Sequence, residues 1–247
     1  MAVIFDAVYG ENLINSIMEG GYEVLNTELG EIFSDLGVII LIPSLYIATL
    51  IVRDRPFSSY SSSRGGWNFK LYLKALIIPF VAFLILGGVE AAIKGPEGTY
   101  HFSIGFLIIT LICVPLQCIA EEYLYRGLIM QTFGSWFKIP VVALILQAIV
   151  FAVSHDYNLF GNIEILFSGI IMGFLAWKAN GIEVSSALHT ANNLSISLLI
   201  MLGIQSATSN AELTDVVISI VFEVILCAII YYIGKKTEWF GEIPENS

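Results

Sequence analysis

Long apolar runs dominate the chain, and short polar stretches separate them. Most of these runs reach about 20 residues, the length of helix that crosses a bilayer core. We therefore predict an all-α fold, a polytopic transmembrane helical bundle of about seven spans. The expected helices cover residues 32–52, 71–93, 102–133, 139–154, 163–177, 183–202 and 213–233.

Composition supports a membrane domain and narrows the class of partner. Hydrophobic residues make up 57% of the 247 residues, charged residues only 13%, and the mean hydropathy is +0.82. This is too apolar for a soluble domain of this size. The net charge of −10 argues against nucleic acid as a partner, because phosphate binding needs clustered Lys and Arg. The three cysteines lie in apolar runs without metal-ligand spacing, so we expect free thiols.

The distribution of Lys and Arg predicts the orientation of the helices, because short cytoplasmic loops carry an excess of these residues. With an outside N-terminus, Lys94 alone falls on the outer side. We therefore expect a multi-pass cell-membrane protein with its N-terminus outside and its C-terminus in the cytoplasm. The residues placed on the inner side are Arg53, Arg55, Arg64, Lys70, Lys74, Lys138, Lys178, Lys235 and Lys236.

The strongest exception to the apolar pattern is the stretch CIAEEYLYRG at 118–127. It places Glu121, Glu122 and Arg126 after a run in which Gln117 is the only strongly polar side chain. Ionisable groups are costly inside a membrane and are functional candidates there. On a helix, Glu122 and Arg126 are i,i+4 neighbours that can form an ion pair. Glu121 is then left for another role.

Two further polar islands lie in later apolar runs. FAVSH places Phe151 and His155 four residues apart, and HTANN does the same for His189 and Asn193. Each pair shares one helix face. A lone His in an apolar helix is more often a hydrogen-bonded structural residue. Together with the carboxylate pair, however, these islands indicate one site to which three helices contribute.

The three islands occur in a fixed order on separate predicted helices. Their sequences are Glu121-Glu122-x-x-x-Arg126, Phe151-x-x-x-His155 and His189-x-x-x-Asn193. This arrangement resembles the three signature motifs of the CPBP family of intramembrane proteases. That family comprises the type 2 CAAX prenyl endopeptidases and bacterial relatives, some described as Abi or bacteriocin-immunity proteins. The resemblance covers residues 102–202 approximately.

The resemblance implies an intramembrane endopeptidase that hydrolyses a peptide bond in a membrane-associated or lipidated protein or peptide. Glu121 would activate the hydrolytic water with help from His155, while His189 and Asn193 would stabilise the oxyanion. A carboxylate in a low-dielectric cavity suits general-base catalysis near neutral pH. Donors aimed at a developing oxyanion commonly supply about 3 kcal/mol each.

The resemblance also assigns supporting positions to Glu122, Arg126 and Phe151, with the first two holding the helix in register. The expected partners are membrane lipid and the peptide or protein substrate. The hydrophobic and polar pattern of the whole chain, together with this resemblance, divides it into four expected regions. These are an acidic amphipathic N-terminal segment at 1–31, two accessory transmembrane helices at 32–101, a CPBP-like catalytic core at 102–203, and the last helix with a cytoplasmic tail at 204–247.

Metal dependence is left with two alternatives. Glu121, His155 and His189 would make a His₂Glu set of the kind that binds zinc and leaves one position for water. Against zinc, the chain has no HExxH pair on one helix, and Asn193 beside His189 suits hydrogen bonding to an oxyanion. We favour a glutamate-type reaction without a cofactor and keep a zinc-dependent one as the alternative.

Two other functions compete with proteolysis. The first is a non-catalytic bacteriocin-immunity or membrane scaffold protein of the same family, which would bind its partner through the same cavity. The second is a transporter in which Glu121, Glu122 and Glu223 carry protons. We disfavour transport because the sequence shows no inverted repeat or paired broken helices.

Overall fold

The computed structural model describes residues 28–206 and 211–240. Within these ranges the chain is built of helices, which confirms the all-α prediction. The expected N-terminal segment at 1–31 lies outside the described residues except for its last four, which begin the first helix. The elements in chain order are α3 (Glu28–Ile39), α4 (Leu41–Val52), α5 (Ser58–Ser61), α6 (Phe69–Lys94), α7 (Ile104–Glu122), η2 (Tyr123–Ile129), α8 (Met130–Phe137), α9 (Pro140–Val153), α10 (Leu159–Lys178), α11 (Glu183–Met201) and α12 (Leu213–Lys236).

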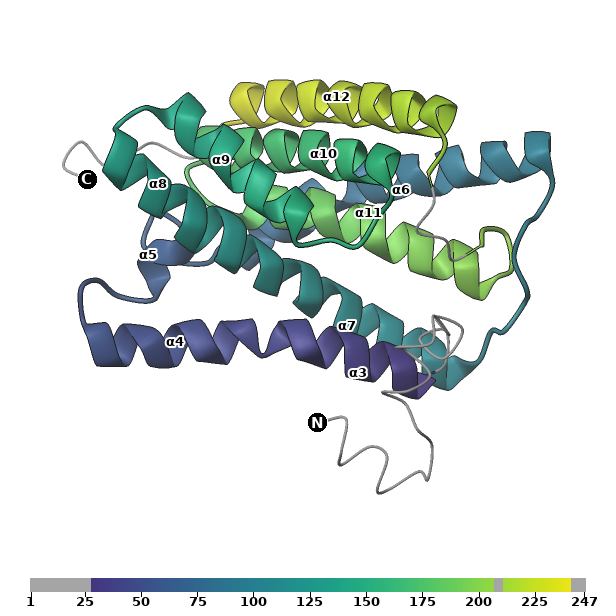
Figure 1. Ribbon diagram of the computed structural model, residues 1–247, viewed down its shortest axis with the longest axis horizontal. Helices are drawn as coiled ribbons and strands as arrows, with labels where there is room; N and C mark the ends of the chain where they lie inside the picture. Colours follow the sequence, from purple (N-terminus) through teal and green to yellow (C-terminus); the bar gives the residue numbers. More distant parts are fainter. Residues whose placement is uncertain (1–27, 207–210, 241–247) are drawn as a thin grey trace.

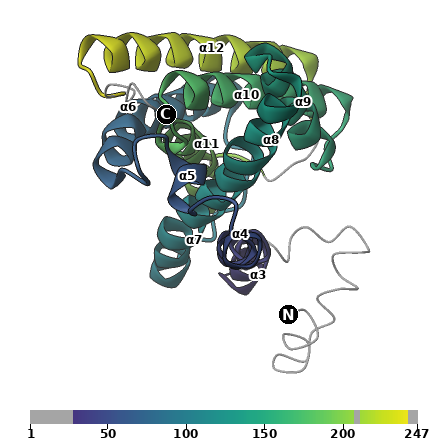
Figure 2. The same ribbon diagram turned by 90° about the vertical axis from the view of Figure 1, so that its left-hand side faces the viewer.

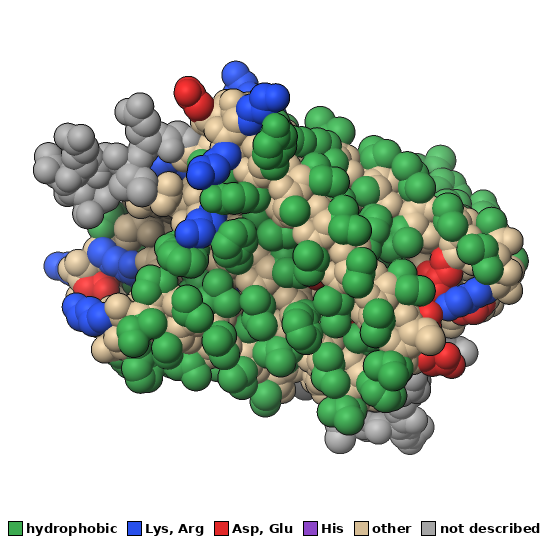
Figure 3. Space-filling model, turned by 90° about the horizontal axis from the view of Figure 1, so that it is seen from above, with side chains coloured by type: hydrophobic (Ala, Val, Ile, Leu, Met, Phe, Trp, Pro, Cys, Tyr) green, Lys and Arg blue, Asp and Glu red, His purple; other side chains and the backbone are tan. Residues whose placement is uncertain are grey.

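The long helices run back and forth along one axis, so their connections gather at the two ends of the bundle (Figure 1). Charged side chains collect toward these ends, and hydrophobic side chains cover the face between them (Figure 3). At one end Lys94 pairs with Asp215 at 2.9 Å, joining α6 to α12. This distribution suits a bundle whose sides face lipid.

Within the described residues, five segments are long and apolar enough to cross a membrane. The expected fourth and sixth spans form α9, which has only 14 residues, and α11, which is interrupted by polar side chains. The structure therefore supports a multi-pass membrane protein, while the count of seven and the orientation stay predictions. The five segments are Ile32–Val52, Phe69–Lys94, Ile104–Phe137, Leu159–Lys178 and Leu213–Lys236.

The third predicted helix is longer than expected and changes its winding. Residues Ile104–Phe137 are helical throughout, but η2 in the middle is a π-helix. A π-helix widens the turn and often marks a functional site. It lies against the α5 region, where a Cβ added to Gly127 would come within 2.7 Å of the Tyr60 carbonyl oxygen. Glycine is therefore required for this approach.

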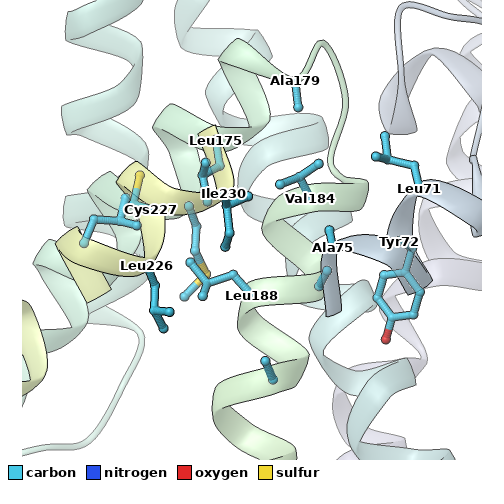
Figure 4. Close-up of a cluster of buried hydrophobic side chains, with 14 of the residues drawn as sticks. Leu71, Tyr72, Ala75, Leu175, Ala179, Val184, Leu188, Leu226, Cys227 and Ile230 are labelled. Atoms are coloured by element: carbon cyan, nitrogen blue, oxygen red, sulfur yellow. The ribbon is translucent and has the colours of Figure 1, made fainter. Parts of the chain in front are cut away.

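Helix α11 lies inside the bundle, between α12 and α10 on one side and α7 on the other (Figure 2). Every residue from Glu183 to Ala191 is buried. Small side chains such as Ser185, Ser186 and Ala187 let neighbouring helices approach closely. Figure 4 shows the apolar cluster in which α6, α10 and α12 pack around this helix, with Leu175, Leu188 and Ile230 among its members.

The connection between α4 and α6 is folded against the start of α11. Arg64 donates from Nη2 to Glu183 Oε2 at 2.9 Å and from Nη1 to the Ala179 carbonyl oxygen at 2.5 Å. The Asn68 backbone N–H also donates to Glu183 Oε1 at 2.9 Å. Since Glu183 is fully buried, this ion pair fixes the beginning of the central helix.

Two carboxyl groups lie between α10 and α12, away from the polar islands of the sequence. The Ser168 hydroxyl lies 2.8 and 2.7 Å from the two carboxyl oxygens of Glu223. One turn away, the Ser219 hydroxyl donates to Glu164 at 2.5 Å. Glu223 is thus a buried, hydrogen-bonded group at a helix interface.

We predict that Glu183→Ala lowers the free energy of unfolding by about 3 kcal/mol, because it leaves the Arg64 charge without its buried partner. The measurement is the thermal unfolding midpoint of the protein in detergent. Lys94→Ala is the matched control: its pair is solvent-exposed, so the loss should stay below about 1 kcal/mol. Equal losses in the two variants would show that the Arg64–Glu183 pair does not stabilise the fold.

Candidate active site

The predicted ion pair between Glu122 and Arg126 forms at the junction of α7 and η2. Arg126 Nη1 donates to Glu122 Oε1 at 2.8 Å, and both side chains are completely buried. Arg126 Nη2 reaches the Gly169 carbonyl oxygen on α10 at 3.3 Å. Gln147 on α9 donates to the same carbonyl oxygen at 2.8 Å. The pair therefore links three helices within the bundle.

His189 on α11 lies between the two adjacent glutamates. Its Nδ1 is 3.1 Å from Glu122 Oε1, and its Nε2 is 3.6 Å from Glu121 Oε2. Because a carboxylate only accepts, the hydrogen-bond network assigns the Nδ1 proton to the Glu122 contact. The Nε2 atom then faces Glu121, and the Asn193 Nδ2 group lies 3.4 Å from it. Three motif residues thus converge on one imidazole.

Phe151 on α9 packs between the remaining parts of the site. Its ring is 4.7 Å from the His155 ring and 6.0 Å from the His189 ring, edge to face in both cases. The Arg126 guanidinium lies 4.4 Å above it. Two imidazoles and a buried cation therefore take their positions from one aromatic side chain.

His155 follows the end of α9 and is partly exposed. Its Nδ1 donates to the Phe151 carbonyl oxygen at 2.7 Å, which leaves Nε2 as the acceptor of the neutral ring. Among the described residues no hydrogen bond joins His155 directly to Glu121. The second motif therefore contacts the first through Phe151, whose ring lies under the Arg126 guanidinium.

The zinc alternative requires Glu121, His155 and His189 to form one set of ligands. Within residues 28–206 and 211–240, no group of three or more His, Cys, Asp or Glu side chains is placed to hold a metal ion. Glu121 and His189 face each other, but among the described residues no hydrogen bond or ion pair joins His155 to either of them. These three residues do not fit a metal ion in this conformation. The glutamate-type reaction without a cofactor stays a prediction, and it is tested below against the zinc alternative.

A cavity of about 300 Å³ lies beside this cluster. Gln117 and Asn193 line it, and they are the residues that contact Glu121 and His189. The other lining residues come from α3, α7, α11 and the segment after α9, and they are Ser34, Asp35, Phe106, Val114, Tyr157, Ile196, Ser197 and Ile200. A peptide segment or water in this cavity would lie next to the polar cluster.

Three features of the site were not expected from the sequence. Gln117 donates to Glu121 Oε1 at 2.6 Å, so its four-residue spacing from Glu121 was an available signal. Tyr125 and Ser154, whose hydroxyls are 2.6 Å apart, connect η2 to the segment of His155. Asp35 lines the cavity from α3, and nothing in the local pattern distinguished it from the other acidic residues near the N-terminus.

Comparison with known families concerns the same part of the chain. One family model matches residues 102–195, which contain every motif residue described above. The model that matches this stretch is that of the Rce1-like family. The description of that family is "Type II CAAX prenyl endopeptidase Rce1-like", and the match confirms the resemblance seen in the three motifs.

One relative has been found among curated proteins. The chain is 25% identical over 212 residues to the "Uncharacterized protein YyaK" of Bacillus subtilis (strain 168), covering 81% of this chain and 70% of the relative. No solved structure matches the chain significantly. The Rce1-like assignment therefore rests on the family match and on the motifs.

We predict that Arg126→Met destabilises the protein by about 3 kcal/mol, because Glu122 would keep a buried charge without its partner. Adding Glu122→Gln should restore part of the lost stability, so the two effects will not add. Thermal unfolding of both single variants and the double variant measures this coupling. Simple additivity would show that the two side chains act independently.

Proposed function

We propose that this protein is an intramembrane endopeptidase that hydrolyses a peptide bond in a membrane-associated or lipidated substrate. The observation that carries the proposal is the position of Glu121, whose carboxylate faces His189 Nε2 and adjoins a polar cavity. The match to type II CAAX prenyl endopeptidases supports the same class of reaction. The apolar sides of the bundle suit a substrate that is held in or at the bilayer.

In the proposed reaction Glu121 removes a proton from a water molecule, which attacks the scissile carbonyl carbon. Gln117 holds one oxygen of this carboxylate at 2.6 Å, leaving the other directed toward His189. Such a fixed carboxylate is suited to general-base catalysis. His155, with Nε2 as an acceptor, assists by orienting the water.

The oxyanion that forms on the carbonyl oxygen needs hydrogen-bond donors. Asn193 provides its side-chain N–H groups, and His189 provides Nε2–H when its ring is protonated. The Glu122 contact at Nδ1 holds the imidazole in place throughout. The proton taken by Glu121 is then available for the leaving amine, so no group outside this set is required.

A non-catalytic immunity or scaffold protein is the rival function. It would use the cavity only for binding, so removing the proton acceptor would leave its activity intact. If cells that carry Glu121→Ala or His155→Ala variants are still protected against a bacteriocin, the rival function is favoured. Loss of protection together with loss of peptide cleavage would favour the endopeptidase.

We predict that Glu121→Gln slows substrate cleavage at least about 100-fold while leaving the protein folded, because the amide cannot accept the proton from water. Membrane peptidomes of cells with the wild-type protein or the variant would identify the processed peptides. Their cleavage rates would then be measured in proteoliposomes.

The control for this experiment is Glu97→Gln, which makes the same chemical change at an exposed glutamate in the loop after α6. It should cleave as fast as the wild type. A folded Glu121→Gln protein that processes its substrate at the wild-type rate would falsify the catalytic assignment.

We further predict that cleavage persists after exhaustive chelation and dialysis, with no metal detected by elemental analysis of the active preparation. This follows because Glu121, His155 and His189 do not form a metal-binding group among the described residues. If chelation abolishes cleavage and added zinc restores it, the reaction is metal-dependent and the glutamate-type assignment is wrong.

A further inference from the structure

Asp35 is an acidic residue of α3 that lies against the cavity beside the candidate active site. Its side chain is 9% exposed, and its Oδ2 atom is buried with no hydrogen-bond partner among the described residues. A buried carboxylate oxygen without a partner is costly, and native proteins rarely retain one without a reason. A ligand that pairs with it would remove that cost.

The rest of the cavity wall indicates which charge such a ligand carries. Among the described residues that line the cavity, none is Lys, Arg or His. Glu121 adds a second carboxylate next to the cavity, and the nearby cation Arg126 is already paired with Glu122. Asp35 Oδ2 and Glu121 Oε2, which have no hydrogen-bond partner among the described residues, therefore favour a positive charge over a negative or neutral group.

The dimensions of the cavity indicate how much of a ligand it accepts. A volume of about 300 Å³ lies at the lower end of the usual range for ligand sites, roughly 300–1,000 Å³. Apolar side chains such as Phe106, Val114 and Ile200 line part of the wall, while Asp35 and Ser34 supply acceptors. This combination fits the aliphatic stem and charged end of a long basic side chain.

We propose that Asp35 binds the side chain of a Lys or Arg close to the scissile bond, so that the protein selects peptides with a basic residue at that position. This inference rests on the proposed endopeptidase function. The cavity connects Asp35 to the candidate active site. Gln117 and Asn193 line the same cavity as Asp35, and they contact Glu121 and His189. Asp35 is thus a specificity-determining residue.

The test uses the full-length protein in liposomes and a library of peptides that carry an N-terminal palmitoyl anchor and a short randomised segment. Mass spectrometry identifies the cleaved bonds, and Glu121→Gln defines the background. We expect Lys or Arg to be enriched beside the cleaved bond. In matched single peptides, Lys should exceed uncharged norleucine about tenfold or more in kcat/KM, as expected for a hydrogen-bonded charge.

Three variants separate recognition from folding. Asp35→Asn should remove the preference for basic residues while cleavage of norleucine peptides continues. Asp35→Lys should shift the preference to Asp and Glu, a gain that a misfolded protein cannot show. Asp54→Asn is the matched control, because Asp54 lies in an exposed loop, and it should retain the wild-type preference.

The outcomes distinguish failure of the Asp35 proposal from failure of the endopeptidase proposal. Cleavage without basic enrichment, or enrichment that is unchanged in Asp35→Asn, overturns the assignment of Asp35 and leaves the endopeptidase function intact. If the cleaved peptides are enriched only in free terminal amines near the cleaved bond, the proposal that Asp35 binds a Lys or Arg side chain is overturned. If the wild-type protein cleaves no peptide above the Glu121→Gln background, the endopeptidase function is contradicted, and the role of Asp35 fails with it.

Discussion

The fully buried ion pair of Glu122 and Arg126 is the interaction on which the site depends. Neither charge is exposed, so each requires the other, and together they fix further groups: the His189 ring, the Gly169 carbonyl and the face of Phe151. Removing one partner of such a pair leaves a charge in an apolar interior, which is far more costly than losing a surface pair. The arrangement of the candidate site therefore depends on the same ion pair that stabilises the bundle.

Within this network the two neighbouring glutamates have different partners. Glu122 Oε1 contacts both a guanidinium and an imidazole, whereas Glu121 has one oxygen bound by Gln117 and the other close to His189. Adjacent residues of one helix point in different directions, so identical side chains meet different surroundings. One carboxylate is part of a buried ion pair, and its neighbour is the one to which we assign the proposed reaction.

The sequence predicted the helices and the polar residues that meet, because both follow from short-range spacing. Four-residue intervals placed Glu122 with Arg126 and His189 with Asn193, and the structure joins them. The sequence could not predict the π-helix η2. Its seven residues are too few to show a hydrophobic period different from that of the α-helices on either side. Asp35 was also missed, because its place beside the cavity depends on how α3 packs against the bundle. The catalytic roles of the converging residues and the region boundaries stay predictions.

The hydrogen bonds between α10 and α12 distinguish one flank of the bundle from the other. Moving α12 outward would leave Glu223 and Glu164 facing hydrocarbon without their serine partners. These hydrogen bonds therefore hold α10 and α12 together on that flank. On the opposite flank α3 and α4 lie at the edge of the bundle (Figure 2), and only 6% of their apolar window is buried. Of the five apolar segments, the one formed by α3 and α4 is therefore the least covered by the rest of the described chain.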